Sequence, residues 1–280
     1  MGVIKVGIVG LGLMGGSLSL ALKKLSEDYY FIGLDHNQQH CKEALELNLV
    51  DEIVTSLDRL KKCDIIFLGI PVDGIINIIS RLSPLASHTT IIDLGSTKEK
   101  ISASIPSDIR TNVVTAHPMT GTEKFGPKAS LENLYTDKVV VLCDLEKSGE
   151  YQQKIATNIF TNMGMNIITM DAKEHDKHTA FISHTPHALS YALANSVLTQ
   201  ENPQNITALA GGGFKDMSRI AKSSPNMWED IFRQNKQNVL KGINAFQVEL
   251  KKCQKMIENE EWENLNKWMQ EANRLHDILD

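Results

Sequence analysis

Short runs of apolar, β-branched residues alternate with amphipathic stretches over the first 170 positions of this 280-residue chain. Several runs, such as the one at 65–68, are continuously apolar, which is typical of strands covered by helices on both faces of a sheet. The predicted strands are 3–9, 30–34, 64–68, 89–93, 112–115, 138–142 and 166–170, and the predicted helices are 14–25, 38–47, 72–82 and 151–163. This order predicts an α/β domain over 1–170 with a doubly wound sheet.

Strand patterns nearly vanish after position 171, and an all-helical second domain is predicted over 171–280. Apolar residues there recur at helical spacing in two stripes, which predict two long amphipathic helices. The stripes consist of Trp228, Phe232, Val239, Ile243, Phe246, Leu250 and Ile257, then Trp262, Leu265, Met269, Ala272 and Leu279. Because these helices have more apolar surface than a domain of this size readily covers, we expect a homodimer, with burial inside one chain as the alternative.

Composition narrows the classes of function. The chain has 29 Lys and Arg against 34 Asp and Glu, which gives a net charge of −5 and argues against a nucleic-acid-binding protein. No apolar run reaches the roughly 20 residues that a membrane span needs, so no membrane contact is expected. The four cysteines, Cys41, Cys63, Cys143 and Cys253, form no CxxC pair. They are typical of incidental thiols in a reducing compartment, and a cytoplasmic location is expected.

Three glycines at fixed spacing follow the first predicted strand, in the sequence GLGLMG at 10–15. The motif lies between a strand and a helix, as it does in the dinucleotide-binding turn of a Rossmann-type domain. Gly10 would allow the tight turn, Gly12 would let the backbone approach a pyrophosphate, and Gly15 would allow close packing of helix on strand. The pyrophosphate would then meet the N–H groups at the start of the helix. The alternative is that the glycines serve only the turn.

Asp35 ends the second predicted strand, 25 residues after Gly10. At about this spacing an acidic side chain accepts a hydrogen bond from the adenine ribose. A carboxylate there would repel the additional phosphate of NADP, so NAD is the predicted cofactor. The residues predicted to contact the cofactor are Gly10, Leu11, Gly12, Met14, Gly15, Asp35 and Pro71.

Two polar segments follow predicted strands where open α/β sheets bind their ligands. The first is GSTK at 95–98, and the second is AHPMTGTEK at 116–124. A histidine suits alcohol oxidation, because a base must take the hydroxyl proton as hydride leaves the same carbon. We therefore predict His117 as a catalytic base and Ser96 as its hydrogen-bonding partner.

A third polar group lies in the helical part of the chain. His184 and His187 are three residues apart and are expected to share a helix face. Three consecutive glycines at 211–213 allow close approach by a ligand, and Arg219 offers a fork suited to a carboxylate. A salt bridge between Arg219 and Asp216 is the alternative.

A metal site is a further alternative, because four histidines lie close together in the sequence: His175, His178, His184 and His187. Cysteine ligands and an HExxH motif are absent, so no metal is expected.

The motifs GLGLMGGS, GSTK, AHPMTGTEKFG, SHTPHA, GGGFKDMSRIA and SPNMWEDIF extend over nearly the whole chain. In these motifs the chain resembles the prephenate and arogenate dehydrogenases of tyrosine biosynthesis. The resemblance implies a Rossmann domain, an all-helical dimerisation domain, and an NAD-dependent oxidative decarboxylation of prephenate. It assigns proton acceptance to His117 with Ser96 as partner, and carboxylate binding to Arg219 and His187. It also implies that Thr122, Glu123 and Gly213 line the substrate pocket.

Alternatives to prephenate remain at this stage. Arogenate differs only in having an ammonium group in place of the keto group. A β-hydroxyacid dehydrogenase would share the glycine turn, although that family uses a lysine base, and a redox-silent NAD-binding dimer would not need Ser96, His117 and Arg219 together. We expect a chain without a fused regulatory or mutase module, so that any feedback by tyrosine would act at the active site.

Overall fold

The computed structural model describes residues 2–279 and contains one eight-stranded sheet with the order β3-β2-β1-β4-β5-β6-β7-β8. The strands are β1 Ile4–Val9, β2 Tyr29–Leu34, β3 Glu52–Ile53, β4 Ile65–Leu68, β5 Thr90–Asp93, β6 Val113–Pro118, β7 Val139–Cys143 and β8 Asn166–Met170. Neighbouring strands are parallel except β6 and β7, which pair antiparallel. The predicted doubly wound α/β domain is confirmed, and the two-residue β3 is an addition to it.

Helices cover both faces of the sheet: α1 Leu13–Leu25, α2 Gln38–Glu46, α3 Leu57–Leu60, α4 Val72–Leu82, α5 Glu99–Ser104 and α6 Glu150–Asn162. Successive side chains of a strand point to opposite faces. In β4, Phe67 accordingly belongs to the buried cluster that contains Leu18 of α1 and Phe160 of α6, whereas Ile66 belongs to the cluster that contains Ile75 of α4. The continuous apolar run at 65–68 is therefore buried on both sides.

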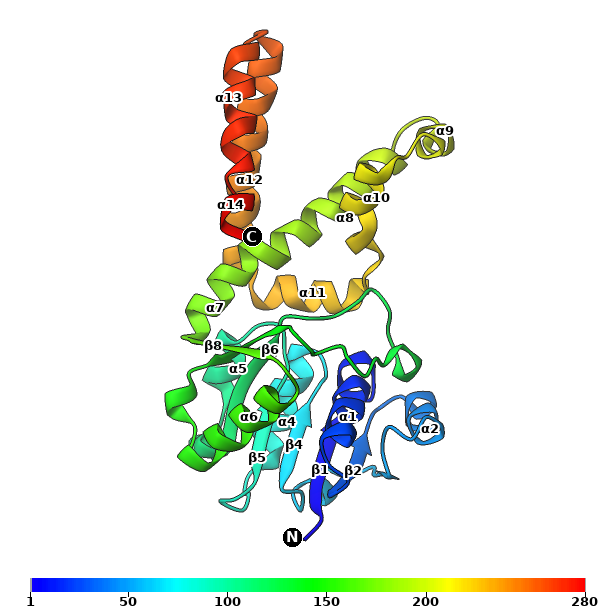
Figure 1. The fold of residues 1–280 in the computed structure, drawn as a ribbon, viewed down its shortest axis with the longest axis vertical. Coiled ribbons are helices and arrows are strands. Elements are labelled where there is room, and N and C mark those ends of the chain that lie inside the picture. Colours follow the sequence, from blue (N-terminus) through cyan, green and yellow to red (C-terminus); the bar gives the residue numbers. More distant parts are fainter. Residues whose placement is uncertain (1, 280) are drawn as a thin grey trace.

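The second part of the chain is entirely helical among the described residues. Its elements are α7 Ala172–Thr179, the π-helical turn η4 Ala180–His184, α8 Thr185–Leu198, α9 Pro203–Ala208, α10 Gly212–Ser218, η5 Arg219–Lys222, α11 Pro225–Gln234, α12 Lys236–Glu258, α13 Trp262–Asn273 and α14 His276–Leu279. Figure 1 shows α11 lying across the top of the α/β domain, while α12 and α13 project away from it as an arm. The predicted all-helical domain is confirmed.

The two apolar stripes do not form two uninterrupted helices as predicted. The first is divided at Asn235, whose backbone (φ −106°, ψ 29°) leaves the helical region between α11 and α12. Its side chain donates hydrogen bonds to the Asp176 carbonyl oxygen (2.6 Å) and to His184 Nδ1 (3.1 Å). The second stripe ends its long helix at Asn273, and α14 follows. Apolar spacing continues through the first break because residues on both sides of it, Trp228 and Ile231 of α11 and Val239 of α12, are buried. The pattern therefore does not reveal the break.

The arm formed by α12 and α13 exposes large apolar side chains in the single chain. Among them are Phe246, Leu250, Ile257, Trp262 and Met269, each at least 40% exposed. Several large apolar side chains exposed along two neighbouring helices indicate a protein–protein contact. Burial inside one chain, the alternative considered above, therefore leaves much of the two stripes uncovered. None of the helices within residues 2–279 combines the length and apolar character that crossing a membrane requires.

Candidate active site

The segments predicted to bind cofactor and substrate meet at one edge of the sheet. The parallel strands β1, β4, β5 and β6 lie side by side, so their carboxyl ends emerge together. The glycine turn follows β1, Pro71 follows β4, Ser96 follows β5, and His117 lies at the end of β6. Above this edge lies α11 of the helical domain (Figure 1). The arrangement is the one in which open α/β sheets bind dinucleotides.

The glycine turn fits a pyrophosphate. Gly10 has φ +91°, and a Cβ there would overlap the Gly69 carbonyl, while a Cβ on Gly15 would overlap the Gly10 carbonyl. A Cβ on Gly12 would meet nothing within 4 Å, which leaves the backbone open to a ligand. Helix α1 begins without a side-chain cap and without an acidic residue in its first turn, so its first N–H groups are available to an anion.

Asp35 is held against the glycine turn. One carboxylate oxygen accepts a hydrogen bond from Leu11 N and the other from Asn37 N, both at 2.8 Å. Two imidazoles approach the same carboxylate: Nδ1 of His36 at 3.4 Å and Nδ1 of His40 at 3.5 Å. Because a carboxylate has about four lone-pair positions, the two backbone hydrogen bonds leave capacity for a ribose hydroxyl.

We expect NAD to be preferred over NADP by at least about tenfold in kcat/KM, because close repulsion between the Asp35 carboxylate and a phosphate amounts to at least about 1.4 kcal/mol. Replacing Asp35 with Ser should narrow this gap, since the repulsion is lost while a hydroxyl remains. Steady-state kinetics with both cofactors test this. Equal use of NAD and NADP by the unaltered protein would contradict it and would implicate His36 in binding the phosphate.

His117 is linked to a second histidine and an aspartate from α7. Its Nδ1 lies 2.8 Å from Nε2 of His175, and Nδ1 of His175 lies 2.8 Å from Oδ1 of Asp176. The Asp176 carboxylate also accepts hydrogen bonds from the backbone N–H groups of Lys98 (2.7 Å) and Glu99 (3.0 Å). The hydrogen bond that the structure gives His117 is therefore with His175 and not with Ser96 as predicted. Ser96 lies half-buried in the adjacent segment, and its role stays a prediction.

A fully buried lysine, Lys98, holds the segment next to His117 in place. The Lys98 ammonium forms an ion pair with Asp93 at the end of β5 and donates a hydrogen bond to the Ala116 carbonyl oxygen at 2.7 Å. Asp93 also accepts a hydrogen bond from Gly95 N at 2.9 Å. The segment that contains Ser96 is thereby fixed to β5 on one side and to the residue preceding His117 on the other.

The surroundings of His117 favour its neutral form. Burial lowers its pKa well below the ordinary value, and the positive charge of the nearby Lys98 lowers it further. Burial likewise lowers the pKa of His184 to about 4. A neutral imidazole is the form that can accept a proton.

The pH dependence of kcat/KM should reflect this depressed pKa. A base must be unprotonated, so activity should fall with decreasing pH only below the roughly 6–7 of an ordinary histidine. Initial rates between pH 5 and 8 measure the acidic limb, and enzyme returned to neutral pH before assay controls for unfolding. An acidic limb at or above the ordinary histidine range would contradict the assignment.

The helical domain brings His187, Trp228 and Arg219 together. The imidazole of His187 donates from Nδ1 to the Ser183 carbonyl oxygen (2.9 Å) and stacks on the buried Trp228 ring, with centroids 3.6 Å apart. Burial is the main cause that lowers the pKa of His187, and the nearby positive charge of Arg219 lowers it further. His184 also meets the Trp228 ring, edge-on at 6.0 Å, so both histidines face it as expected.

Arg219 is exposed and is not held by an acidic neighbour. No carboxylate of residues 2–279 lies within the 4.0 Å ion-pair distance of its guanidinium, so the alternative of a salt bridge with Asp216 is not observed. A Cβ at Gly211, Gly212 or Gly213 would meet nothing within 4 Å. Packing therefore does not explain this run of glycines, and the space beside them is open.

Thr122 and Glu123 lie on the loop that follows β6, the strand of His117. Thr122 is exposed and Glu123 is half-buried. The far end of the loop is fixed to the cofactor side of the domain, where Lys128 pairs with Glu43 of α2 at 3.0 Å. The structure thus brings both residues to the edge where His117 lies, and their contact with substrate stays a prediction.

Sequence reasoning missed His175, Asp176, Lys98 and Asn235, and it assigned Trp228 only to an apolar stripe. The adjacent His175 and Asp176 gave a signal, because an imidazole next to a carboxylate is a common catalytic pairing. From the sequence alone, His175 is considered only as a metal ligand. Within residues 2–279 no three His, Cys, Asp or Glu side chains converge in a way that would hold a metal ion.

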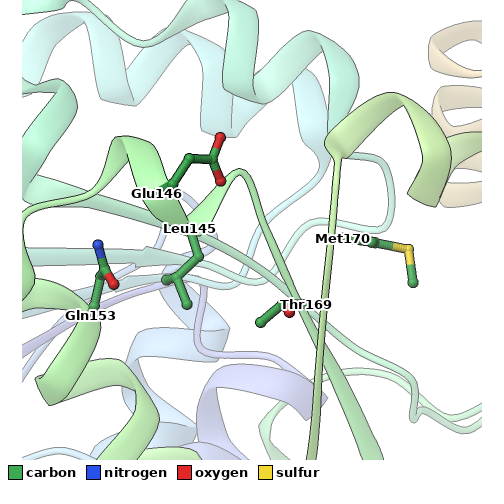
Figure 2. Close-up of a pocket in the computed structure, with 5 residues that line it drawn as sticks. All are labelled: Leu145, Glu146, Gln153, Thr169 and Met170. Atoms are coloured by element: carbon green, nitrogen blue, oxygen red, sulfur yellow. The ribbon is translucent and has the colours of Figure 1, made fainter.

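A depression of about 320 Å³ lies elsewhere on the domain, beside the edge strand β8. Figure 2 shows its lining residues, Leu145, Glu146, Gln153, Thr169 and Met170. None of them belongs to the group around His117, and Glu146 is the only ionisable side chain among them. This depression has no catalytic arrangement.

The fold and the site define a two-domain dinucleotide-dependent oxidoreductase with a histidine at the sheet edge. Residues 18–169 match the family model described as prephenate dehydrogenase, nucleotide-binding domain, and residues 171–271 match that described as prephenate dehydrogenase, dimerization domain. The chain belongs to the prephenate dehydrogenase family.

Individual relatives agree over the whole length. The prephenate dehydrogenase of Bacillus subtilis is 31% identical over 97% of this chain and 75% of its own length. The crystal structure of the Aquifex aeolicus prephenate dehydrogenase with hydroxyphenyl propionate and NAD+ has a TM-score of 0.92 at 33% identity, covering 100% of this chain and 99% of that one. The Synechocystis arogenate dehydrogenase structure has a TM-score of 0.81 at 29% identity, covering 99% and 100%.

Proposed function

We propose that this chain catalyses the NAD-dependent oxidative decarboxylation of prephenate to 4-hydroxyphenylpyruvate, with release of CO2 and NADH. The observation that carries the proposal is the position of His117 at the carboxyl end of β6, on the same edge of the sheet as the glycine turn that follows β1. Burial, which lowers the pKa of His117, agrees with its role as a base. The similar Aquifex aeolicus enzyme, whose structure holds NAD+ together with a hydroxyphenyl compound, supports it.

His117 takes the hydroxyl proton in this mechanism. NAD, when bound at the glycine turn, supplies the acceptor for the hydride that leaves the hydroxyl-bearing ring carbon. As this carbon becomes a carbonyl, its hydroxyl proton moves to Nε2 of His117. The bond from the ring to its carboxylate then breaks, CO2 leaves, and the electron pair aromatises the ring. The new phenolate takes the proton back from His117, so no net proton is released.

Arg219 and His187 are suited to the anionic substrate. Prephenate has two carboxylates, and an exposed guanidinium without an ion-pair partner in the described chain offers a bidentate site for one of them. His187 has Nδ1 engaged with Ser183, which leaves Nε2 to contact the ligand. Thr122, Glu123 and Gly213 complete the proposed pocket, with Ser96 beside His117.

Arogenate is the second candidate substrate. The similarity of this chain to the Synechocystis arogenate dehydrogenase supports this candidate. The same proton and hydride transfers apply, because the two compounds differ only at the side-chain keto or ammonium group. An ammonium group requires an acceptor, and the half-buried Glu123 is the acidic residue of the proposed pocket.

Initial rates of NADH formation at 340 nm, measured with NAD and either prephenate or arogenate, test the proposal. We expect a higher kcat/KM for prephenate. A higher value for arogenate would transfer the assignment to the second candidate, and an absence of NADH with both would reject both.

The functional unit is a homodimer, since the helical residues 171–271 match the family's dimerisation domain and their arm exposes apolar side chains. We also infer a cytoplasmic location, which the four unpaired cysteines support. Tyrosine, which has the phenol of the product and a carboxylate, would inhibit by competing at the same pocket.

A further inference from the structure

The contacts of Asp176 fix the direction of every hydrogen bond that leads to His117. Both carboxylate oxygens already accept backbone N–H groups, from Lys98 and from Glu99. A carboxylate has only acceptor positions when ionised, so Nδ1 of His175 must donate to it. A neutral His175 then has an unprotonated Nε2, which can only accept. Nδ1 of His117 must therefore donate to it, and the proton of neutral His117 is on Nδ1.

This proton assignment leaves Nε2 of His117 unprotonated. The opposite tautomer would put two lone pairs against each other across the 2.8 Å contact between the imidazoles. Burial lowers the pKa of His175, which keeps that residue in the neutral form that the chain of bonds requires. The two imidazole rings meet edge to face, with centroids 5.0 Å apart and planes at 69°, so His175 also limits rotation of the His117 ring.

The pair is itself rigidly held from the helical domain. Both His175 and Asp176 are at most 2% exposed. The backbone carbonyl of Asp176 accepts a hydrogen bond from Asn235 at the break between α11 and α12 (2.6 Å). Asp176 thus connects α7 to two other places: its carboxylate contacts the start of α5, and its backbone carbonyl contacts the junction of α11 and α12.

We infer that His175 and Asp176 form a positioning relay that fixes His117 in the tautomer with Nε2 free to accept the substrate proton. The inference rests on the proposed role of His117 as base. His175 and Asp176 act through His117 and are not catalytic residues themselves. The relay also makes the base dependent on docking of the two domains, because His117 belongs to the sheet and the relay to α7.

Two substitutions of His175 separate positioning from packing. Replacing it with Leu removes the acceptor for His117 Nδ1, and kcat should fall on the order of 10²-fold with KM for prephenate and NAD within about twofold. Replacing it with Gln restores a carbonyl acceptor, and most of the lost kcat should return. The matched control is His178→Leu on the same helix, whose side chain is 53% exposed, and its kcat should be unchanged.

The double variant distinguishes failure of the relay from failure of the proposed function. If the relay acts only through His117, then combining His175→Leu with His117→Asn should cost no more kcat than His117→Asn alone. In 15N NMR of the histidine-labelled protein, His117 should have its proton on Nδ1, and His175→Leu should redistribute it between the nitrogens.

Three results would overturn the relay. The first is an unaltered kcat in His175→Leu. The second is an equal loss of kcat in the Leu and Gln variants that parallels a loss of thermal stability. The third is a proton on Nε2 of His117 in the unaltered protein. Full activity of His117→Asn would instead reject the proposed base, whatever the His175 variants show.

Discussion

Replacing His117 with Asn lowers kcat by about 10²–10⁴ on this account, because general base catalysis contributes that much to the rate. Asparagine is the informative substitution, since its amide N–H can still donate to Nε2 of His175 in place of Nδ1. The relay and the sheet edge are then preserved while the proton acceptor is lost. NAD binding, measured by fluorescence titration or calorimetry, should stay nearly unchanged, because the glycine turn lies on β1 and α1.

The pH profile of the Asn variant provides the control. Its residual activity should lack the acidic limb that the unaltered enzyme shows. If the limb persists, then another group is the base, and His187 is the first to examine.

If bound prephenate shields the exposed Arg219 guanidinium from water, then breaking the resulting charge pair costs about 2–5 kcal/mol. Replacing Arg219 with Gln should then raise KM for prephenate by a factor of roughly 30 to several thousand. The carboxylate that Arg219 binds is held in the ground state and in the transition state alike, so kcat should change less. Lysine should restore only part of the affinity, because it lacks the bidentate fork.

The structure also predicts what Arg219→Gln leaves alone. The side chain is exposed and forms no ion pair within the described chain, so the melting temperature and the dimer should be unaltered. Lys222→Gln, an exposed cation on the same short helix η5, is the matched control and should leave KM unchanged. A variant that is less stable but retains its KM would contradict the carboxylate-binding role.

Features with a local signal could be predicted from the sequence. The alternation of apolar runs follows from strands buried on both faces, and it located seven strands to within a few residues. The glycine turn could be predicted because its three glycines recur at a fixed spacing within six residues, between a strand pattern and a helix pattern. The two-residue β3 could not, since it is too short to have a period.

Features that depend on distant contacts could not be predicted. His117 and His175 are 58 residues apart in the sequence, and no pattern indicates that α7 approaches the end of β6. The predicted partner, Ser96, is nearer in the sequence, yet the adjacent Lys98 and Glu99 are fixed to Asp176 instead. Asn235 breaks a helix for the same reason, because its side chain satisfies groups on α7 and η4.

The central claim is that a hydride transfer and a decarboxylation occur in one reaction on prephenate. The measurement that tests it most directly is the product balance of purified protein incubated with NAD and limiting prephenate, following NADH by absorbance, CO2 by trapping and the aromatic product by chromatography. The account predicts NADH, CO2 and 4-hydroxyphenylpyruvate in equal amounts. NADH formed without a matching amount of CO2, or no NADH at all, would contradict it.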